Sequence, residues 1–231
     1  MKYYGLKVYD LEESLVASGF PMLEEAYTST AFDNEVENLR FWLLNTPKDE
    51  IISDSKCKIS DLVNEGCSPM YIEAIKHIKR GITLGNAKSG SGHDCFEKGC
   101  LVSVNIQAPQ HFWLQFERYG FQDTVSSMSS MHRIAKMNIK EIANKYVDDR
   151  VINVLNELIE EYNENPTAEN FHKVANNIPE GIELTRRITT NYLQLKTMYA
   201  QRKHHKMKDW SVDFVGMCES LPWFNELVLK K

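Results

Sequence analysis

The pattern of hydrophobic and polar residues divides the first half of the chain into short strands and amphipathic helices. "LKVYDL" (6–11) predicts a short strand, and "EESLVASGF" (12–20) predicts a helical turn. Apolar residues recur at helical spacing in 34–44 and again in 68–80, so each of these segments is expected to form a helix with one buried face. "GCLVSVNIQAP" (99–109) is the best strand in the sequence and ends at a proline.

The second half of the chain is expected to be mostly helical. Helical segments are predicted at 110–121, 138–146, 148–163 and 167–178. The longest helical candidate runs from about Glu183 to His204, and the final segment predicts another helix with a hydrophobic tail, docked or shared with a neighbouring subunit. Few strands among many helices make the predicted fold class α+β, helix-rich with a small sheet. The 231 residues are expected to form a single domain, 1–231, with helical insertions.

Composition narrows the class of protein without naming a function. A hydrophobic fraction of 42% and a charged fraction of 26% are those of an ordinary soluble globular protein. The net charge of -5 gives no overall attraction to nucleic acid or to acidic membranes, so neither is an expected partner. Five scattered cysteines without a C-x-x-C pair favour reduced thiols, and no apolar leader or membrane-length segment is visible. We therefore expect a cytoplasmic protein.

The segment "LGNAKSGSGHDCF" (84–96) breaks all periodicity and is a candidate ligand loop. Its glycines allow backbone amides to approach a ligand, and Ser89 and Ser91 can hydrogen-bond phosphate oxygens. The spacing is not that of a P-loop, and a plain flexible loop stays an open alternative. His93 and two nearby cysteines lack a fourth ligand at recognisable spacing, so no metal site is expected.

A second candidate is "RYGFQDTVSSMSSMHR" (118–133), in which five hydroxyl side chains lie between two arginines. The run is compatible with a polar loop, a helix entry or a ligand cradle. His132 lies close to the serines, but the G-x-S-x-G elbow of a hydrolase is absent. Nothing in the segment therefore points to a nucleophilic serine.

The predicted long helix carries an excess of positive charge, because no acidic residue occurs between Leu184 and Met207. On a helix, Arg187 and Arg202 would lie on one stripe, about 22 Å apart at 1.5 Å per residue. The stripe also contains Asn191, Gln194 and Met198. A stripe of this kind suits an extended anionic ligand such as a dinucleotide, and the alternative is a solvated basic face.

Three segments, taken in order, resemble the flavin-dependent thymidylate synthase family, and particularly its divergent, phage-like members. In the first segment, 89–113, His93 follows a short polar loop and precedes the strand 101–106. An H-x-W element at His111 and Trp113 follows the strand, as it does in the family.

The second segment is 118–133, which occupies the place of the family signature, in which Arg-His-Arg precedes a serine. This sequence reads Gln-Phe-Glu at 115–117, and the signature serine falls on Ser126. The third segment, 189–210, matches the family's last conserved helix at Asn191, Arg202 and Trp210. The resemblance covers 90–133 and 179–218.

The resemblance implies a homotetramer built around an α/β domain that binds FAD between subunits. It implies that NADPH reduces the flavin, that methylenetetrahydrofolate donates one carbon, and that dUMP is methylated at C5. It also implies that Arg202 is the catalytic arginine, which polarises the uracil ring with a planar cation. No protein nucleophile is needed, because the cofactor carries the chemistry.

The resemblance also assigns binding residues. Those expected to bind the flavin cofactor are His93, Ser91, Gln115, Glu117 and Asn191. Those expected to bind the nucleotide substrate are Ser126, Ser127, Arg118, Arg133 and Arg187. Arg118 and Arg133 are assigned from charge and proximity, as replacements for the missing signature arginines, and Arg187 or Arg186 replaces a family arginine that is absent near Ala175.

Three alternatives remain open from the sequence. The altered 115–117 segment favours a sibling reaction, such as C5 hydroxymethylation of a uracil nucleotide. A non-catalytic relative could keep the fold and bind flavin or nucleotide without turnover. A helical interaction protein would make the resemblance accidental.

Overall fold

The computed structural model describes residues 1–88 and 91–229, within which the chain divides into two compact units. The sheet unit comprises Met1–Lys7, Ser103–Thr190 and Met198–Met217. The helical unit comprises Val8–Val102, Asn191–Thr197 and Cys218–Lys231. One domain over 1–231 stays a prediction, because two compact units can fold together as one domain.

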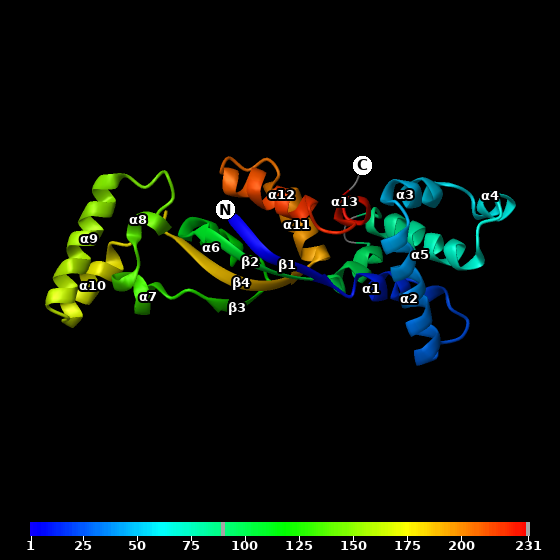
Figure 1. Ribbon diagram of the computed structural model, residues 1–231, viewed down its shortest axis with the longest axis horizontal. Coiled ribbons are helices and arrows are strands. Elements are labelled where there is room, and N and C mark those ends of the chain that lie inside the picture. The colour runs from blue at the N-terminus through cyan, green and yellow to red at the C-terminus, as the bar shows by residue number, and fades with distance from the viewer. Residues whose placement is uncertain (89–90, 230–231) are drawn as a thin grey trace. The chain divides into compact units, whose positions relative to one another are not determined.

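A four-stranded sheet organises the first unit, and its strands follow the order β1-β2-β4-β3 (Figure 1). The strands are β1 (Lys2–Tyr9), β2 (Leu101–Pro109), β3 (Asp123–Ser127) and β4 (Glu183–Asn191). The two strands expected from the sequence are confirmed, although the first begins at Lys2 rather than at residue 6. A small sheet among many helices confirms the predicted α+β class.

One face of β2 is buried because its apolar residues alternate with polar ones. Val104, Ile106 and Ala108 are fully buried, whereas the residues between them are half-buried. Helix α6 (Gln110–Phe116) follows β2 directly. The indole N–H of its Trp113 donates hydrogen bonds to the carbonyl of Ala108 on β2, at 3.0 Å, and to the carbonyl of Leu184 on β4, at 3.2 Å. The side chain that anchors α6 thus ties β2 to β4.

Aromatic rings fill the space next to α6. Trp210, in the π-helical segment Asp209–Phe214, stacks on Phe112 at 4.2 Å between ring centroids. Phe116 stacks on Phe112 at 5.7 Å, and all three rings are fully buried. Offset ring pairs at these distances add to the stability supplied by burial alone.

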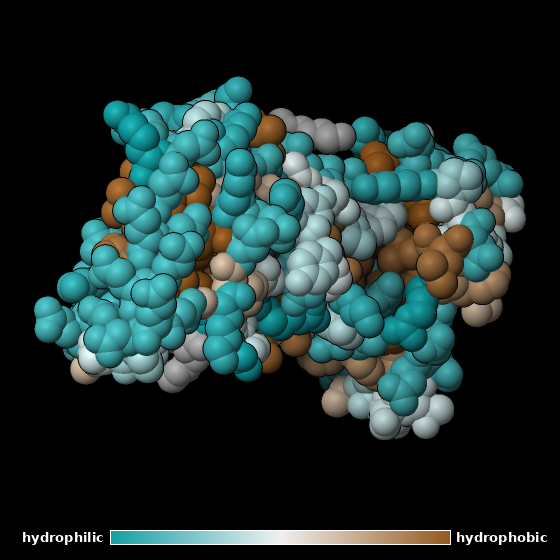
Figure 2. Space-filling model, turned by 60° about the vertical axis from the view of Figure 1, so that its left-hand side comes forward, coloured by the Kyte–Doolittle hydropathy of each residue, from teal (hydrophilic) through white to brown (hydrophobic). Residues whose placement is uncertain are grey.

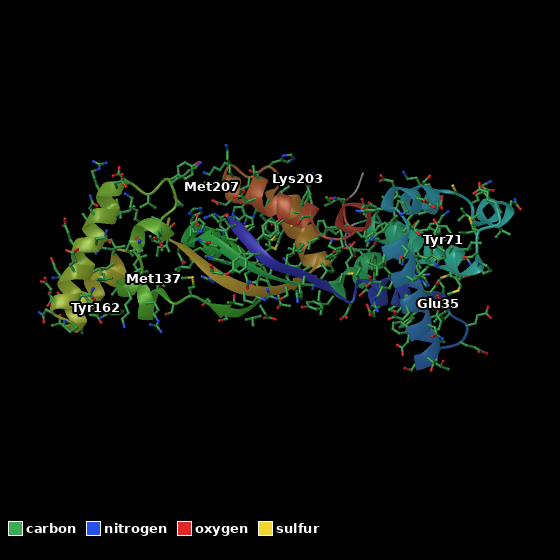
Figure 3. The ribbon with its side chains drawn as sticks, in the orientation of Figure 1. Glu35, Tyr71, Met137, Tyr162, Lys203 and Met207 are labelled. Carbon is green, nitrogen blue, oxygen red and sulfur yellow. The ribbon has the colours of Figure 1, made fainter. Side chains whose placement is uncertain are left out.

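The helices between β3 and β4 form a small hydrophobic core of their own. Amphipathic α9 (Asp149–Glu164) packs on α10 (Ala168–Asn176), and its inner face is apolar. Met137 and Tyr162 pack against the same cluster (Figure 3). Figure 2 shows that the outward surface in this region is mostly hydrophilic. The buried residues of the cluster are Ile134, Ile139, Ile152, Leu155, Ile159, Val174, Ile182 and Leu184.

The helices predicted at 148–163 and 167–178 are therefore confirmed, but two other segments are shorter than expected. The helix predicted at 110–121 ends at Phe116, as α6. At 138–146 the helix is reduced to one turn, α8 (Ile139–Ile142), preceded by the turn α7 (Ser130–Arg133) and a 3-10 turn at Ile134–Lys136. The chain after α8 leaves the helix to form an isolated bridge between Ala143 and Ile182.

The helical unit is built around α5 (Pro69–Gly85), which contacts most of the other helices in the unit (Figure 1). These helices are α1 (Leu11–Ala17), α2 (Ser29–Asn45), α3 (Lys48–Lys56), α4 (Ile59–Asn64) and α13 (Phe224–Leu227), with 3-10 turns at Phe20–Met22 and His93–Lys98. The helices predicted at 34–44 and 68–80 are confirmed as parts of α2 and α5.

The C-terminal segment also behaves as expected, because the buried α13 docks on α5 of its own chain. It is preceded by α12 (Val215–Glu219), which follows the π-helical segment directly. No helix in the described part of the chain is long and apolar enough to cross a membrane.

The predicted long helix from Glu183 to His204 is wrong. Residues Glu183–Asn191 form strand β4, and only Tyr192–Arg202 form a helix, α11. The β-branched segment "ITT" and the burial of Leu184, Ile188 and Thr190, which share one face of a strand, suit a strand between two neighbours better than a helix face. The basic stripe therefore does not exist. Two of its members, Gln194 and Met198, are buried.

Ser68 sets the start of α5. Its hydroxyl accepts a hydrogen bond from the backbone N–H of Tyr71 at 3.2 Å, and Pro69 occupies the first helical position. We expect Ser68→Ala to lower the free energy of unfolding by about 1 kcal/mol, because one amide loses its cap. Urea denaturation measures the change. Ser60→Ala, at an exposed position without a capping bond, is the control, and an equal loss there would contradict the capping role.

Candidate functional site

Arg202 is the last residue of α11 and belongs to the sheet unit. Two nitrogens of its guanidinium, Nε and Nη1, donate hydrogen bonds, and one face of the group lies over an aromatic ring. Its Nε donates to the hydroxyl of Tyr119 at 2.8 Å, and its Nη1 donates to Oε1 of Gln115 at 3.0 Å. The guanidinium carbon lies 4.5 Å from the ring centroid of Trp210, which is itself fixed in the aromatic core. A half-buried planar cation in this setting is pre-organised to stabilise negative charge on a flat ring.

A second arginine is held by Glu117, two residues after Gln115. Arg186, on β4, forms a salt bridge with Glu117, and its guanidinium carbon lies 4.6 Å from the ring centroid of Trp113. The predicted cofactor residues Gln115 and Glu117 therefore each hold one arginine. Their role in binding a flavin stays a prediction.

The serine-rich segment forms the edge strand β3 at its centre and enters the one-turn helix α7 at Ser130. In the antiparallel pairing of β3 with β4, Ser126 lies opposite Arg187 and Ser127 lies opposite Arg186. Successive side chains of a strand point to opposite faces, so these two serines do not share a face. A ligand bound on the side of Arg186 would therefore meet Ser127.

Arg187 points to the other face of the sheet, where it serves the structure. Its Nη1 donates to the carbonyl of Gly5 at 2.9 Å and to Asn105 at 3.5 Å. Gly5 has a positive φ of 62°, and a Cβ there would lie 3.3 Å from the same guanidinium. Arg118 and Arg133 are exposed, and the described part of the chain gives neither a salt bridge. They stay predicted substrate ligands.

The three other predicted cofactor residues belong to the helical unit. Ser91 and His93 are exposed on either side of Gly92, which has a φ of 77° and open space at its Cα. Asn191 caps α11, because its Oδ1 accepts a hydrogen bond from the backbone N–H of Gln194 at 2.9 Å. Ser89 and Gly90, which belong to the same predicted loop, lie outside the described residues.

A buried charged cluster lies under the exposed His93 turn. Lys196 forms salt bridges with Asp94 at 2.9 Å and with Glu97 at 3.0 Å. Burial raises the pKa of Glu97 to about 7, although the charge of Lys196 opposes the shift. This cluster was not predicted from the sequence. Its only signal was a lone lysine on the otherwise apolar side of a helix.

Two clefts in the described part of the chain do not coincide with the predicted site. A cleft of about 1090 Å³ in the sheet unit is lined by His111, Tyr146, Lys206 and Asp209, among others. A cleft of about 530 Å³ in the helical unit lies between α3 and α5. None of the predicted site residues lines either cleft.

Comparison with solved structures identifies the fold, whereas comparisons of the sequence found no match. No protein-family model and no curated protein matches the sequence. A crystal structure of the flavin-dependent thymidylate synthase ThyX from Helicobacter pylori, complexed with FAD and dUMP, is similar with a TM-score of 0.55 and 13% identity, over 67% of this chain and 82% of that chain. A second structure of the same enzyme with FAD and dUMP gives a TM-score of 0.55 and 14% identity, over 68% and 84%.

This chain therefore has an α+β fold of the flavin-dependent thymidylate synthase type. At 13–14% identity the likeness extends to the fold, and the site has to be argued from this chain's own residues.

Proposed function

We propose that this protein methylates C5 of a pyrimidine nucleotide, converting dUMP to dTMP with FAD, NADPH and methylenetetrahydrofolate. The observation that carries the proposal is Arg202, a stacked and hydrogen-bonded arginine on a fold whose solved neighbours are complexed with FAD and dUMP. Two edges of its guanidinium are held by protein, and no described residue hydrogen-bonds to its Nη2. That nitrogen is free to donate to a uracil carbonyl oxygen.

The residues present fit a flavin at the helical unit. Gly92 leaves the backbone between Ser91 and His93 open to close approach, and both side chains are exposed. Asn191 uses its Oδ1 for the helix cap, which leaves its amide N–H groups for a flavin acceptor. When bound, FAD would supply the hydride after reduction by NADPH.

The chain's own residues bind and polarise the nucleotide. Arg202 would stabilise the negative charge that develops on the uracil ring when C5 reacts, and the stack on Trp210 keeps its plane fixed. Ser127, on the side of Arg186, would hydrogen-bond a phosphate oxygen. Arg118 and Arg133 would neutralise the phosphate, because both are exposed cations near this strand in sequence.

The site is proposed to be completed by other copies of the chain, in a homotetramer. In one copy the predicted residues are exposed or half-buried and line neither of the two clefts described above, whereas a cofactor is normally enclosed. A second subunit would supply the missing walls.

One observation favours a second candidate. Glu117 places a carboxylate beside Arg186, and the salt bridge neutralises a cation that a phosphate would otherwise use. The second candidate is therefore a protein in which the Glu117–Arg186 salt bridge takes the place of a phosphate contact. Such a protein would catalyse a related C5 hydroxymethylation of a uracil nucleotide, or would bind flavin or nucleotide without catalysis.

The test uses the purified full chain. A flavin absorption spectrum is expected from the protein as isolated or after reconstitution with FAD. With NADPH and methylenetetrahydrofolate, tritium release from C5-labelled dUMP is expected, and mass spectrometry of the product distinguishes a methyl from a hydroxymethyl group. Flavin binding without tritium release from any uracil nucleotide would favour the non-catalytic candidate. Absence of both would exclude the proposal.

A further inference from the structure

A largely buried lysine, whose side chain is 16% exposed, joins α11 to the 3-10 turn that begins at His93. The ammonium of Lys196 donates to Asp94 Oδ2 at 2.9 Å, to Glu97 Oε1 at 3.0 Å and to the carbonyl of Gly85 at 2.7 Å. All three ammonium hydrogens are thereby used. The Glu97 side chain is completely buried, and all these residues belong to the helical unit.

The residues of the cluster lie next to predicted flavin contacts in the sequence. Asp94 directly follows His93, and Glu97 lies one turn further on. Lys196 lies little more than one turn after Asn191, at the start of α11. One side chain thus connects the two elements of this unit that carry predicted flavin contacts.

General stability does not explain such a cluster. Buried ion pairs can often be replaced by apolar residues of similar volume with no loss of stability, because desolvation offsets their attraction. Here one oxygen of Glu97, Oε2, is buried without a hydrogen-bond partner, which adds a cost. What an apolar replacement cannot supply is direction, since three short bonds fix the turn at one place and in one orientation.

We propose that Lys196 is a positioning residue of the flavin site, which holds the His93–Lys98 turn against the start of α11 and thereby sets Ser91 and His93 relative to Asn191. The proposal rests on the proposed function for the identity of the ligand. Its structural part, the fixing of the turn, stands on the described contacts alone.

The structural part is tested without any cofactor, by hydrogen–deuterium exchange of the apo protein. We expect Lys196→Met to speed exchange of amides in the 93–99 segment at least tenfold, because the variant loses the two bonds from Lys196 to Asp94 and Glu97 that hold this turn to α11. Lys76→Met is the matched control, because Lys76 pairs with Glu73 on the exposed surface of α5. Unchanged exchange in Lys196→Met would overturn the proposal.

The functional part is tested by FAD titration of the same variants, followed by the flavin absorption spectrum. We expect Lys196→Met to weaken FAD binding at least tenfold and to shift the bound spectrum, and Lys196→Arg, which keeps a cation with several donors, to recover most of the affinity. Faster exchange with unchanged FAD affinity would overturn the positioning role. A wild-type chain that binds no FAD would overturn the proposed function, while the exchange result would still decide whether Lys196 fixes the turn.

A second variant guards against misfolding of Lys196→Met, which leaves two buried carboxylates unpaired. Lys196→Met combined with Asp94→Asn and Glu97→Gln removes all three charges and keeps similar volumes. We expect this variant to retain the wild-type circular dichroism spectrum and to show the same loss of FAD affinity. Wild-type FAD affinity in the triple variant would overturn the proposal.

Discussion

Replacing Arg202 with alanine is expected to lower turnover by about a hundred- to a thousandfold while FAD stays bound. The reason is local. In the proposed site the Nη2 edge of Arg202 faces the substrate, and among the predicted flavin contacts only Gln115 is hydrogen-bonded to Arg202 in the described part of the chain. Tritium release from C5-labelled dUMP measures turnover, and the flavin absorption spectrum measures cofactor content.

Arg202→Lys tests whether geometry matters beyond charge. Lysine keeps the cation but loses the planar edges that bind Tyr119 and Gln115, so we expect a turnover between those of alanine and wild type. Arg150→Ala is the matched control, because Arg150 is exposed and bonds only to the neighbouring Asp148. Wild-type turnover in Arg202→Ala would remove Arg202 from the mechanism.

The second large effect is a loss of stability with rising pH, caused by Glu97. Burial raises the pKa of Glu97 from 4.5 to about 7, so the folded state binds its proton more tightly than the unfolded state does. The groups that face it are Lys196, Asp94 and the thiol of Cys100. The stabilising contribution is full below pH 4.5 and is lost as the pH rises through 7. At about 1.4 kcal/mol for each unit, the total is on the order of 3 kcal/mol.

Glu97→Gln should remove this dependence, because glutamine keeps an acceptor for Lys196 and does not titrate. We expect urea denaturation at pH 5 to 8 to show a smaller decline in the free energy of unfolding for Glu97→Gln, and a variant more stable than wild type at pH 8. Glu73→Gln, at an exposed carboxylate, serves as the control. Parallel pH curves for Glu97→Gln and wild type would show that Glu97 is ionised at low pH like an exposed carboxylate.

Helices with strong local signals could be predicted from the sequence. Both α2 and α5 have apolar residues at helical spacing, and Ser68 at the N-cap marks the start of α5 within a few residues of chain. The start of α2 at Ser29, capped by Thr28, was not predicted, because the expected helix began at residue 34. The β2 strand could be predicted for the same reason, because it combines β-branched residues with a closing proline. These elements need no information from distant segments.

The segment 183–204 shows where local information is insufficient. "ELTRRITTNYLQLK" contains enough spaced apolar residues to suggest a helix, yet its first nine residues form a strand because β2 and β3 lie on both sides of it. Pairing partners more than fifty residues away decide this choice, and a reading of the segment alone cannot include them. The error also created the basic stripe, which placed Arg187 and Arg202 on one surface.

The chemistry divides in the same way. The sequence alone was enough to single out Arg202, the serine-rich segment 118–133 and a polar loop before a strand as candidate site elements, because this choice needs only residue types and their order. Only the tertiary structure showed that Tyr119, Gln115 and Trp210 surround Arg202, and that a lysine of α11 lies buried against Glu97. The contacts with Tyr119, Gln115 and Glu97 join residues about 80 to 100 positions apart, since Arg202 follows Tyr119 by 83 residues and Lys196 follows Glu97 by 99, whereas Trp210 follows Arg202 by only eight. A contact of this length exists only once the chain has folded, because it is the packing of strands and helices, and no local preference, that brings the two residues together.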